Sequence, residues 1–430
     1  MAKLPIKVEN ASIKIEKLVP GGQGIATADN GKKGFFWNAL PGEIVTEYTI
    51  TKKKSHYFEA IAEKIENPSK RRIAPKDTCY LATSPWQIMD YDYELEQKRE
   101  LLIESFRQAG LTDTDETLLV NFVQTDGHDF NYRNKMEYSL YWDIAEAEIK
   151  LAQHQRGSHR KLPLETSSIE RPEIWKKANE IVADLNARHE EARKYQSLLL
   201  RCNQTGEVSG GLYENHQPHP VFDNLTDKIL GYEYSYSPNG FFQINLPVYE
   251  MALREIKKHI DTDKVLDLYA GVGTIGLSVA RDKELTLVEC NKFAYQELEK
   301  NCSNCCFARP FATTGAKSRE LTLGDGMSDR YPQGNKQAVL SNSEDALEYI
   351  QPDQTVIVDP PRAGCDKKLL DKFISTNPQT IIYLSCNPAT QARDLKILLD
   401  SNKYQIVSIT PFNFFPRTPH LENLVVLKHL

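Results

Sequence analysis

The feature that most constrains the fold of this chain is an alternation of strand-like and helix-like segments that begins near residue 264. Short apolar runs typical of buried strands lie at Val265–Tyr269, Leu285–Glu289, Val356–Asp359 and Ile381–Cys386. Helical patterns separate them, and such alternation is typical of a doubly wound parallel sheet. The last two runs, at 404–409 and 424–427, have no helical pattern between them. We therefore expect an α/β sheet that finishes in an antiparallel pair.

A glycine-rich loop follows the first of these predicted strands. Residues 267–276 read Asp-Leu-Tyr-Ala-Gly-Val-Gly-Thr-Ile-Gly, a G-x-G-x-x-G between a strand and a helix. Glu289 ends the next strand, where a carboxylate can accept hydrogen bonds from ribose hydroxyls. The pattern suits NAD as well as S-adenosylmethionine, which leaves a hydride-transfer enzyme open. Asp267 favours S-adenosylmethionine, because a carboxylate repels a pyrophosphate at the helix N-terminus and attracts an ammonium and a sulfonium.

Three polar groups follow or precede strands in the C-terminal half. Cys386 stands at a strand end before Asn-Pro, Asp359 begins an Asp-Pro-Pro-Arg segment, and Glu422 adjoins the last apolar run. A thiol nucleophile, a methyl donor and a carboxylate base are the parts required to methylate carbon 5 of a pyrimidine. Asp359 and Arg362 are expected to face the same crevice and to hold the base or order the cysteine loop. The alternative for a single cysteine is a buried, inert thiol.

The N-terminal segment differs in charge from the rest of the chain. Net charge is -6, whereas residues 1–64 contain ten lysines against seven acidic residues. Short β-prone stretches alternate with glycine turns as far as residue 66, which predicts a small β-barrel. A barrel with Lys52–Lys54 at a strand end could hold RNA. The alternative is an ordinary surface charge run on a β domain.

The length and composition set the remaining bounds. A chain of 430 residues should hold two or three domains. We expect a linker near 67–72, a helix at about 93–109 and a helical pattern over 173–200 in a mixed α+β middle. No apolar run approaches the roughly 18 residues of a membrane span, and the N-terminus lacks the apolar core of a signal peptide. A cytoplasmic protein without a membrane partner is therefore expected, and we also expect a monomer.

The eight cysteines are too sparse for a disulfide framework in a chain of this length. Cys302, Cys305 and Cys306 contain one C-x-x-C but no second pair at zinc-finger spacing. We therefore expect no metal site in this cluster.

With these residues assembled, the chain resembles the RNA uracil-5-methyltransferase family, whose members make 5-methyluridine in 23S rRNA or tRNA. The matching motifs are Asp359–Gly364, Ser385–Thr390 with Arg393–Leu395, His420–Asn423 and Phe241–Asn245. The resemblance implies a TRAM-like, OB-like RNA-binding barrel at 1–66 and a mixed α+β central domain with linker at 67–255. It also implies a Rossmann-like class I S-adenosylmethionine methyltransferase domain at 256–430.

The same resemblance implies roles for individual residues. Cys386 matches the nucleophile and Glu422 the base. The positions that match S-adenosylmethionine contacts are Gln243, Tyr269, Thr274, Glu289, Asn342 and Asp359. The implied target is a uridine in 23S rRNA, with tRNA as the alternative. A non-catalytic RNA-binding protein on a methyltransferase fold is the alternative from another class.

One departure from the family concerns an iron–sulfur cluster. Many rRNA members hold a four-iron four-sulfur cluster on four cysteines, of which Cys79 remains here. The segments 83–88 and 167–169, where others are expected, contain none. A single thiol cannot hold the cluster, so none is expected. The insertion at about 306–338 fits no family pattern.

Overall fold

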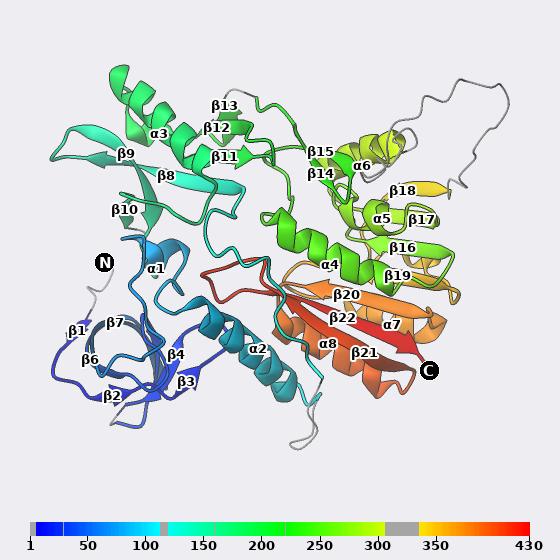
Figure 1. Cartoon of the computed structure of the whole chain (residues 1–430), viewed down its shortest axis with the longest axis horizontal. Helices are drawn as coiled ribbons and strands as arrows, with labels where there is room; N and C mark the ends of the chain where they lie inside the picture. Colours follow the sequence, from blue (N-terminus) through cyan, green and yellow to red (C-terminus); the bar gives the residue numbers. More distant parts are fainter. Residues whose placement is uncertain (1–5, 29, 112–118, 159, 220, 306–334) are drawn as a thin grey trace, which may run out of the picture.

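The computed structural model describes residues 6–28, 30–111, 119–158, 160–219, 221–305 and 335–430. Three larger sheets with seven, six and seven strands and one two-stranded hairpin make up these parts. In Figure 1 the N-terminal sheet lies at the lower left, the middle sheet above it and the C-terminal sheet at the right. Most of the insertion noted at 306–338 lies outside the described residues.

The N-terminal sheet confirms the strands predicted for the first 66 residues, but among the described residues its two end strands do not pair, so the predicted barrel is a curled sheet that is not closed. Its strands are β1 (Ile6–Val8), β2 (Ile13–Lys14), β3 (Lys17–Leu18), β4 (Gly24–Thr27), β5 (Lys33–Trp37), β6 (Ile44–Lys53) and β7 (Tyr57–Glu66). β2 pairs with β6 and β3 with β4, and the backbone of Ile15 between them bonds to Glu43. The sheet therefore curls around a core that includes Phe36 and Phe58.

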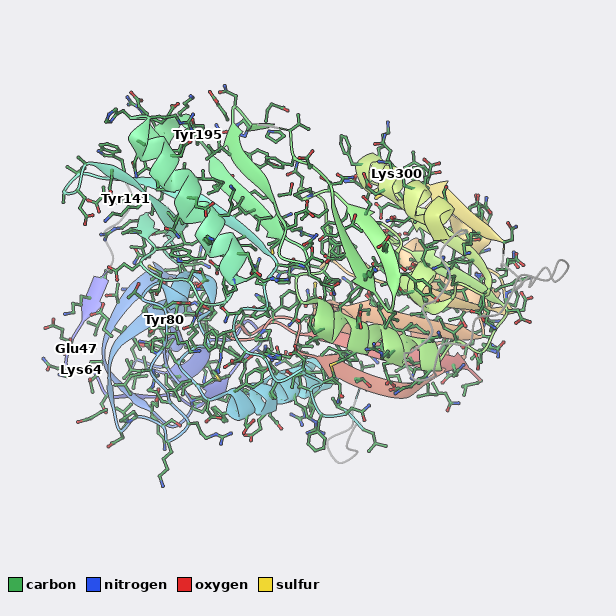
Figure 2. All side chains as sticks on the ribbon, turned by 45° about the horizontal axis from the view of Figure 1, so that its top comes forward. Glu47, Lys64, Tyr80, Tyr141, Tyr195 and Lys300 are labelled. Carbon is green, nitrogen blue, oxygen red and sulfur yellow. The ribbon has the colours of Figure 1, made fainter. Side chains whose placement is uncertain are left out.

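The linker is tied to the curled sheet by buried polar contacts. Arg72 donates from Nε and Nη2 to the fully buried carboxylate of Glu43, each at 2.7 Å. The hydroxyl of Tyr80, on α1 (Tyr80–Thr83), donates to Asn38 at 2.9 Å. Figure 2 shows Tyr80 beside this sheet, and Glu47 and Lys64 paired on its outer surface. α2 (Tyr91–Gln108) follows, and the side chain of its N-cap residue, Asp90, accepts the backbone N–H of Tyr93.

The middle sheet has the order β10-β9-β8-β11-β12-β13. Its elements are β8 (Lys135–Asp143), β9 (Glu148–His154), β10 (Lys161–Pro163), α3 (Pro172–Ala187), η1 (Ala192–Lys194), β11 (Ser197–Cys202), β12 (Val208–Glu214) and β13 (Gln217–His219). The predicted helical pattern over 173–200 is wrong at its end. The helix stops at Ala187, and 197–202 form a fully buried strand. A continuous leucine run carries no period that distinguishes a strand from a helix.

A hairpin, β14 (Leu225–Ile229) and β15 (Tyr232–Tyr236), leads into α4 (Leu246–Lys258). The predicted boundary at 255 falls inside α4, and the division into domains stays a prediction. Helix α4 packs into the same apolar core as the hairpin and the C-terminal sheet, through residues such as Leu253 and Ile256.

The C-terminal sheet confirms the predicted α/β architecture. Its elements are β16 (Lys264–Leu268), α5 (Thr274–Val279), β17 (Glu284–Glu289), α6 (Lys292–Cys305), β18 (Lys336–Leu340), η2 (Leu347–Tyr349), β19 (Gln354–Val358), α7 (Lys367–Thr376), β20 (Thr380–Ser385), α8 (Pro388–Asp400), β21 (Tyr404–Phe412) and β22 (Glu422–His429). The order is β18-β17-β16-β19-β20-β22-β21, with β22 antiparallel to both neighbours. The expected antiparallel finish is therefore present.

Two apolar cores cover the faces of this sheet. One includes Leu253 from α4 and Leu298 from α6, and the other includes Phe373 from α7 and Leu395 from α8. α2 joins the second core through Leu102 and Phe106, so a helix from the first quarter of the chain covers the C-terminal sheet. In the described parts of the chain, no helix is both long and apolar enough to cross a membrane.

Candidate active site

A cavity of about 960 Å³ lies at the carboxyl ends of the parallel strands. Its walls come from the loop after β16, the ends of β17, β19 and β20, the start of β22, and residues 239–244. Polar side chains after neighbouring parallel strands meet at one edge of the sheet, which is where ligands bind in open α/β sheets.

Six of the eight predicted site residues line this cavity. They are Gln243, Tyr269, Glu289, Asp359, Cys386 and Glu422. They come from six separate segments, which the fold brings together from 180 residues of sequence. The two predicted catalytic residues therefore share one cavity with most of the predicted cofactor residues.

Thr274 and Asn342 lie elsewhere. Thr274 is buried, and its hydroxyl bonds to that of Tyr249 at 2.7 Å, so it points into the protein. Asn342 is exposed in the turn after β18 and donates to Asp345 at 3.0 Å. Neither is among the residues that line the cavity. Their assignment to cofactor binding stays a prediction from the family resemblance.

The glycine loop is shaped by backbone geometry and by Glu289. Gly271 and Gly273 have φ of 57° and 87°, in the left-handed region where a side chain is unfavourable. Glu289 accepts the backbone N–H of Gly271 at 2.8 Å and of Asn291 at 2.6 Å, one on each carboxylate oxygen. Tyr269 also has positive φ, and its hydroxyl donates to Glu344 at 2.6 Å. Glu289 thus fixes the loop and lines the cavity at once.

The sequence predicts that the carboxylate of Asp267 attracts the ammonium of the cofactor, but Asp267 is not among the residues that line the cavity. It is fully buried, and its Oδ2 accepts the backbone N–H of Gly276 at 2.8 Å. Within the described structure, Oδ1 has no hydrogen-bond partner. Burial raises the pKa of Asp267 to about 7. The carboxyl therefore stabilises the glycine-rich segment through the backbone of Gly276 and does not contact the cavity.

Two loops that carry the predicted chemistry are tied to each other. Cys386 follows β20 and stands one residue before the N-cap of α8. Asn387 and Thr390 both donate to the carbonyl of Arg362, at 2.9 and 3.1 Å. The expectation that the Asp-Pro-Pro-Arg segment orders the cysteine loop is therefore met by the backbone of Arg362.

The acids around Cys386 oppose ionisation of the thiol. Burial, followed by the carboxylates of Glu422 and Asp359, raises the pKa of Cys386 to about 11, against the lowering effect of Arg362. Burial and then Asp359 raise the pKa of Glu422 well above its ordinary value. Burial also raises the pKa of Asp359 to about 7. A positive charge bound in this cavity would lower the pKa of all three groups.

Glu422 has a free acceptor. The residue is 5% exposed, and its Oε2 forms no hydrogen bond with any described residue. A buried carboxylate oxygen without a partner carries a desolvation cost that a bound group could relieve. This oxygen is therefore available to a ligand in the cavity.

The region expected to lack an iron–sulfur cluster is filled by hydrogen bonds. The thiol of Cys79 donates to the carbonyl of Pro163 at 3.2 Å. Nearby, Asp77 accepts from Gln87 at 2.7 Å and from the hydroxyl of Ser168 at 2.8 Å. Across the described residues, no group of three or more His, Cys, Asp or Glu side chains is placed to hold a metal ion. The side chains of Cys305 and Cys306 lie outside the described part of the chain.

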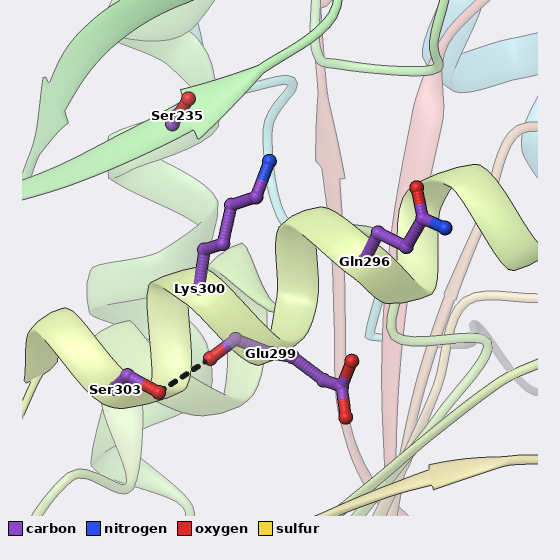
Figure 3. Close-up of a pocket in the computed structure, with 5 residues that line it drawn as sticks. All are labelled: Ser235, Gln296, Glu299, Lys300 and Ser303. Carbon is purple, nitrogen blue, oxygen red and sulfur yellow. Dashed lines mark hydrogen bonds between the residues drawn. The ribbon is translucent and has the colours of Figure 1, made fainter.

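A second, shallower hollow lies along α6, with Ser235 facing it from β15 (Figure 3). Lys300 is its cation, and that ammonium already pairs with Glu297 at 3.2 Å. Ser303 donates to the backbone carbonyl of Glu299. The ammonium of Lys300 and the hydroxyl of Ser303 therefore already have partners within the helix.

Comparison with known proteins relates the chain to RNA methyltransferases. Residues 336–430 match the family model described as tRNA (Uracil-5-)-methyltransferase, and residues 248–331 match one described as Conserved hypothetical protein 95. An uncharacterized RNA methyltransferase of Prochlorococcus marinus is 28% identical over 91% of this chain and 99% of its own length. An uncharacterized RNA methyltransferase of Lactobacillus johnsonii is also 28% identical, over 98% of this chain and 99% of its own length.

A solved structure agrees in fold. The tRNA (uracil-54, C5)-methyltransferase of Pyrococcus abyssi, in complex with S-adenosyl-L-homocysteine, superposes with a TM-score of 0.69 at 20% identity. The match covers 96% of this chain and all of that one. The C-terminal part of the chain thus matches the tRNA (Uracil-5-)-methyltransferase model, and nearly its whole length is similar to RNA methyltransferases. It is a methyltransferase, and the hydride-transfer alternative is set aside.

The methyltransferase cavity also includes residues that the sequence motifs did not identify. Phe293, from the start of α6, is 80% exposed and lines the cavity. Phe241, the first residue of the matching motif at 241–245, also lines it and is 73% exposed. Arg133 lines it from the middle of the chain, although its segment stood out only as a basic turn. An exposed aromatic on the first turn of a helix after an acidic strand end is the signal that could have identified Phe293.

Proposed function

We propose that this protein transfers a methyl group from S-adenosylmethionine to carbon 5 of a uridine in 23S rRNA, through a covalent bond between Cys386 and carbon 6. The observation that carries the proposal is the single cavity lined by Cys386, Glu422, Asp359 and the glycine loop. A thiol, a carboxylate and a cofactor loop in one enclosed space are the parts that this reaction requires.

The residues that would hold the cofactor lie on one side of the cavity. Glu289 would accept hydrogen bonds from ribose hydroxyls, and Tyr269 and Gln243 would contact the rest of the molecule. Gly271 lines the cavity without a side chain, and a Cβ built there would meet no atom within 4 Å, so a bound molecule can approach its backbone. S-adenosylmethionine supplies an electrophilic methyl group and a positive charge. That charge favours the ionised forms of Cys386, Asp359 and Glu422.

The proposed reaction balances with one proton released. The Cys386 thiol loses its proton to water, and the thiolate adds to carbon 6 of the uracil. The electron pair of the carbon 5–carbon 6 double bond then becomes available at carbon 5, which takes the methyl group. Glu422 removes the proton from carbon 5, the double bond re-forms, and the carbon 6–sulfur bond breaks to return the thiolate. Glu422 then gives its proton to water and the Cys386 thiolate takes one back, so the net release is one proton.

The choice of 23S rRNA rests on the N-terminal sheet. A curled, lysine-bearing sheet resembles the TRAM domain of rRNA members, and Lys53 and Lys54 form no ion pair with a described residue. The tRNA alternative has support from the family model and the Pyrococcus protein, both named for tRNA. We further propose a cytoplasmic monomer with domains at 1–66, 67–255 and 256–430.

The test is covalent trapping. Incubation with S-adenosylmethionine and RNA that contains 5-fluorouridine should give a protein–RNA complex that survives denaturation, because fluorine at carbon 5 cannot leave as a proton would. Cys386→Ala should abolish the complex, whereas Cys290→Ala, which alters an exposed cysteine, should not. Equal trapping by Cys386→Ala and the parent would refute the nucleophile. A protein that binds RNA but never traps would favour the non-catalytic alternative.

The base has its own test. Glu422→Gln should bind RNA and cofactor normally but stall after methyl transfer, so that a methylated covalent complex accumulates on ordinary uridine RNA. Loss of a general base typically lowers turnover by ~100- to 10,000-fold. Normal turnover of this variant would remove Glu422 from the mechanism.

A further inference from the structure

The loop between β21 and β22, residues 413–421, supplies one wall of the cavity. Phe415 of this loop lines the cavity, and Glu422 follows directly after it. In Figure 1 the loop, drawn in red, leaves the C-terminal sheet and extends toward α2 and the N-terminal half. Its conformation therefore affects where the proposed base stands.

A buried ion pair on α2 holds the first part of the loop. Glu94 and Lys98 are both fully buried, and their charged atoms are 2.8 Å apart. The ammonium of Lys98 also donates to Asn413 Oδ1 at 2.5 Å and to the carbonyl of Phe415 at 3.0 Å. Glu94 accepts the backbone N–H of Arg417 on both oxygens, at 3.0 and 3.1 Å. Each charge of the pair thus also binds the loop.

The guanidinium of Arg417 completes the attachment. It is 3% exposed, donates to the carbonyl of Met89 at 2.7 Å and pairs with Asp129. Its Cζ atom lies 5.3 Å from the ring centre of Tyr91 and 5.1 Å from that of Phe130. These contacts join the loop to residues on either side of α2, Met89 before it and Asp129 after it.

The backbone of Arg417 is strained. Its φ is 63°, a conformation that residues with a side chain adopt at a cost and that persists only when the surroundings enforce it. The Arg417 carbonyl accepts the N–H of Trp86 at 3.0 Å, and the carbonyl of Pro416 accepts the hydroxyl of Tyr132 at 3.0 Å. The surrounding segments therefore determine the loop's shape.

Stability alone does not account for this arrangement. Taking charges out of water costs about as much as their attraction returns, so buried ion pairs add little net stability over apolar residues. A strained backbone subtracts further. What the network does provide is one fixed conformation for a loop that ends at the proposed base.

We propose that Arg417 is a positioning residue which, together with the buried Glu94–Lys98 pair, fixes Phe415 and Glu422 at the cavity. The inference rests on the proposed role of Glu422. Displacing a general base by a fraction of an ångström slows proton removal more than it affects binding. Loss of Arg417 should therefore resemble loss of Glu422 more than loss of fold or cofactor.

The informative variant is Arg417→Gly. Glycine accepts a φ of 63° without strain, so the backbone can stay while the guanidinium is removed. Turnover should fall ~10- to 100-fold, cofactor affinity should stay within about twofold, and a methylated covalent complex should accumulate on ordinary uridine RNA. Lys98→Met, which keeps length and removes the charge, should do the same. The control is Arg188→Gly, which removes an exposed arginine at the end of α3.

The outcomes separate the alternatives. Parental turnover by Arg417→Gly would overturn the proposal, as would reduced turnover without the accumulated complex, since that indicates a structural role. If Arg417→Gly does not fold, the same two results for Lys98→Met decide. Failure of the parent itself to trap 5-fluorouridine RNA would instead count against the proposed function.

Discussion

The effect of the Glu422 charge on Cys386 can be tested without RNA, through the ionisation of the thiol. Glu422→Gln removes a negative charge that disfavours the thiolate, so the pKa of Cys386 should fall from about 11. A neighbouring charge shifts a pKa by roughly one unit or more. At pH 9 the thiolate fraction would then rise from about one in a hundred to about one in ten.

The expected rate change is smaller than the tenfold change in thiolate. A thiolate of lower pKa is intrinsically less nucleophilic, with a Brønsted coefficient of about 0.4–0.5, which reduces the gain to about three- to fourfold. The assay is alkylation by iodoacetamide at pH 9, followed by mass spectrometry of the peptide that contains Cys386. Arg362→Gln should slow the same reaction, because Arg362 lowers the pKa of the thiol.

A remote acid provides the control. Glu180→Gln alters an exposed carboxylate on α3 and should leave the rate unchanged. The reasoning fails if Glu422→Gln reacts at or below the parental rate, or if Arg362→Gln reacts faster. Either result would mean that these charges do not act on Cys386 as their positions require.

Three further predictions concern other parts of the chain. Asp267→Asn should raise the melting temperature more at pH 8 than at pH 5. The pKa of Asp267 is about 7 in the folded protein against an ordinary value near 4, so the fold loses stability as the pH rises through this range and the buried carboxyl ionises. The neutral amide avoids that loss. Asp77→Ala should lower the free energy of unfolding by ~1–3 kcal/mol, because it removes the carboxylate that accepts hydrogen bonds from Gln87 and Ser168, and denaturant titration measures this. Replacing Lys53 and Lys54 together by Ala should reduce the slope of log RNA affinity against log salt by ~0.7 for each phosphate that the protein no longer neutralises, with unchanged cofactor affinity; an unchanged slope would leave the N-terminal sheet without a role in RNA binding.

The sequence predicted the C-terminal sheet well because its strands are short, continuous apolar runs that end in Gly, Pro or Asp. β16, β17, β19 and β20 each lie within two residues of the predicted runs. Polar residues directly after such strands meet at one edge by topology alone, which explains why Cys386, Asp359 and Glu289 share the cavity.

The sequence could not show in which direction individual side chains point. β16 is buried on both faces, so periodicity could not show that Asp267 supports the glycine loop and does not face the cavity. Periodicity also could not show that the hydroxyl of Thr274 bonds to Tyr249 of α4, and the assignment of Thr274 to cofactor binding stays a prediction. The Lys98–Asn413 contact joins residues 315 apart in sequence, and no local pattern predicts such a pairing.

The most direct test of the central claim is a map of 5-methyluridine in total RNA from cells with and without the gene. We predict that one or more uridines of 23S rRNA lose the methyl group when the gene is absent. Parental protein should restore it, and Cys386→Ala should not. Loss from tRNA alone would favour the tRNA alternative. An unchanged map in every RNA would contradict the account.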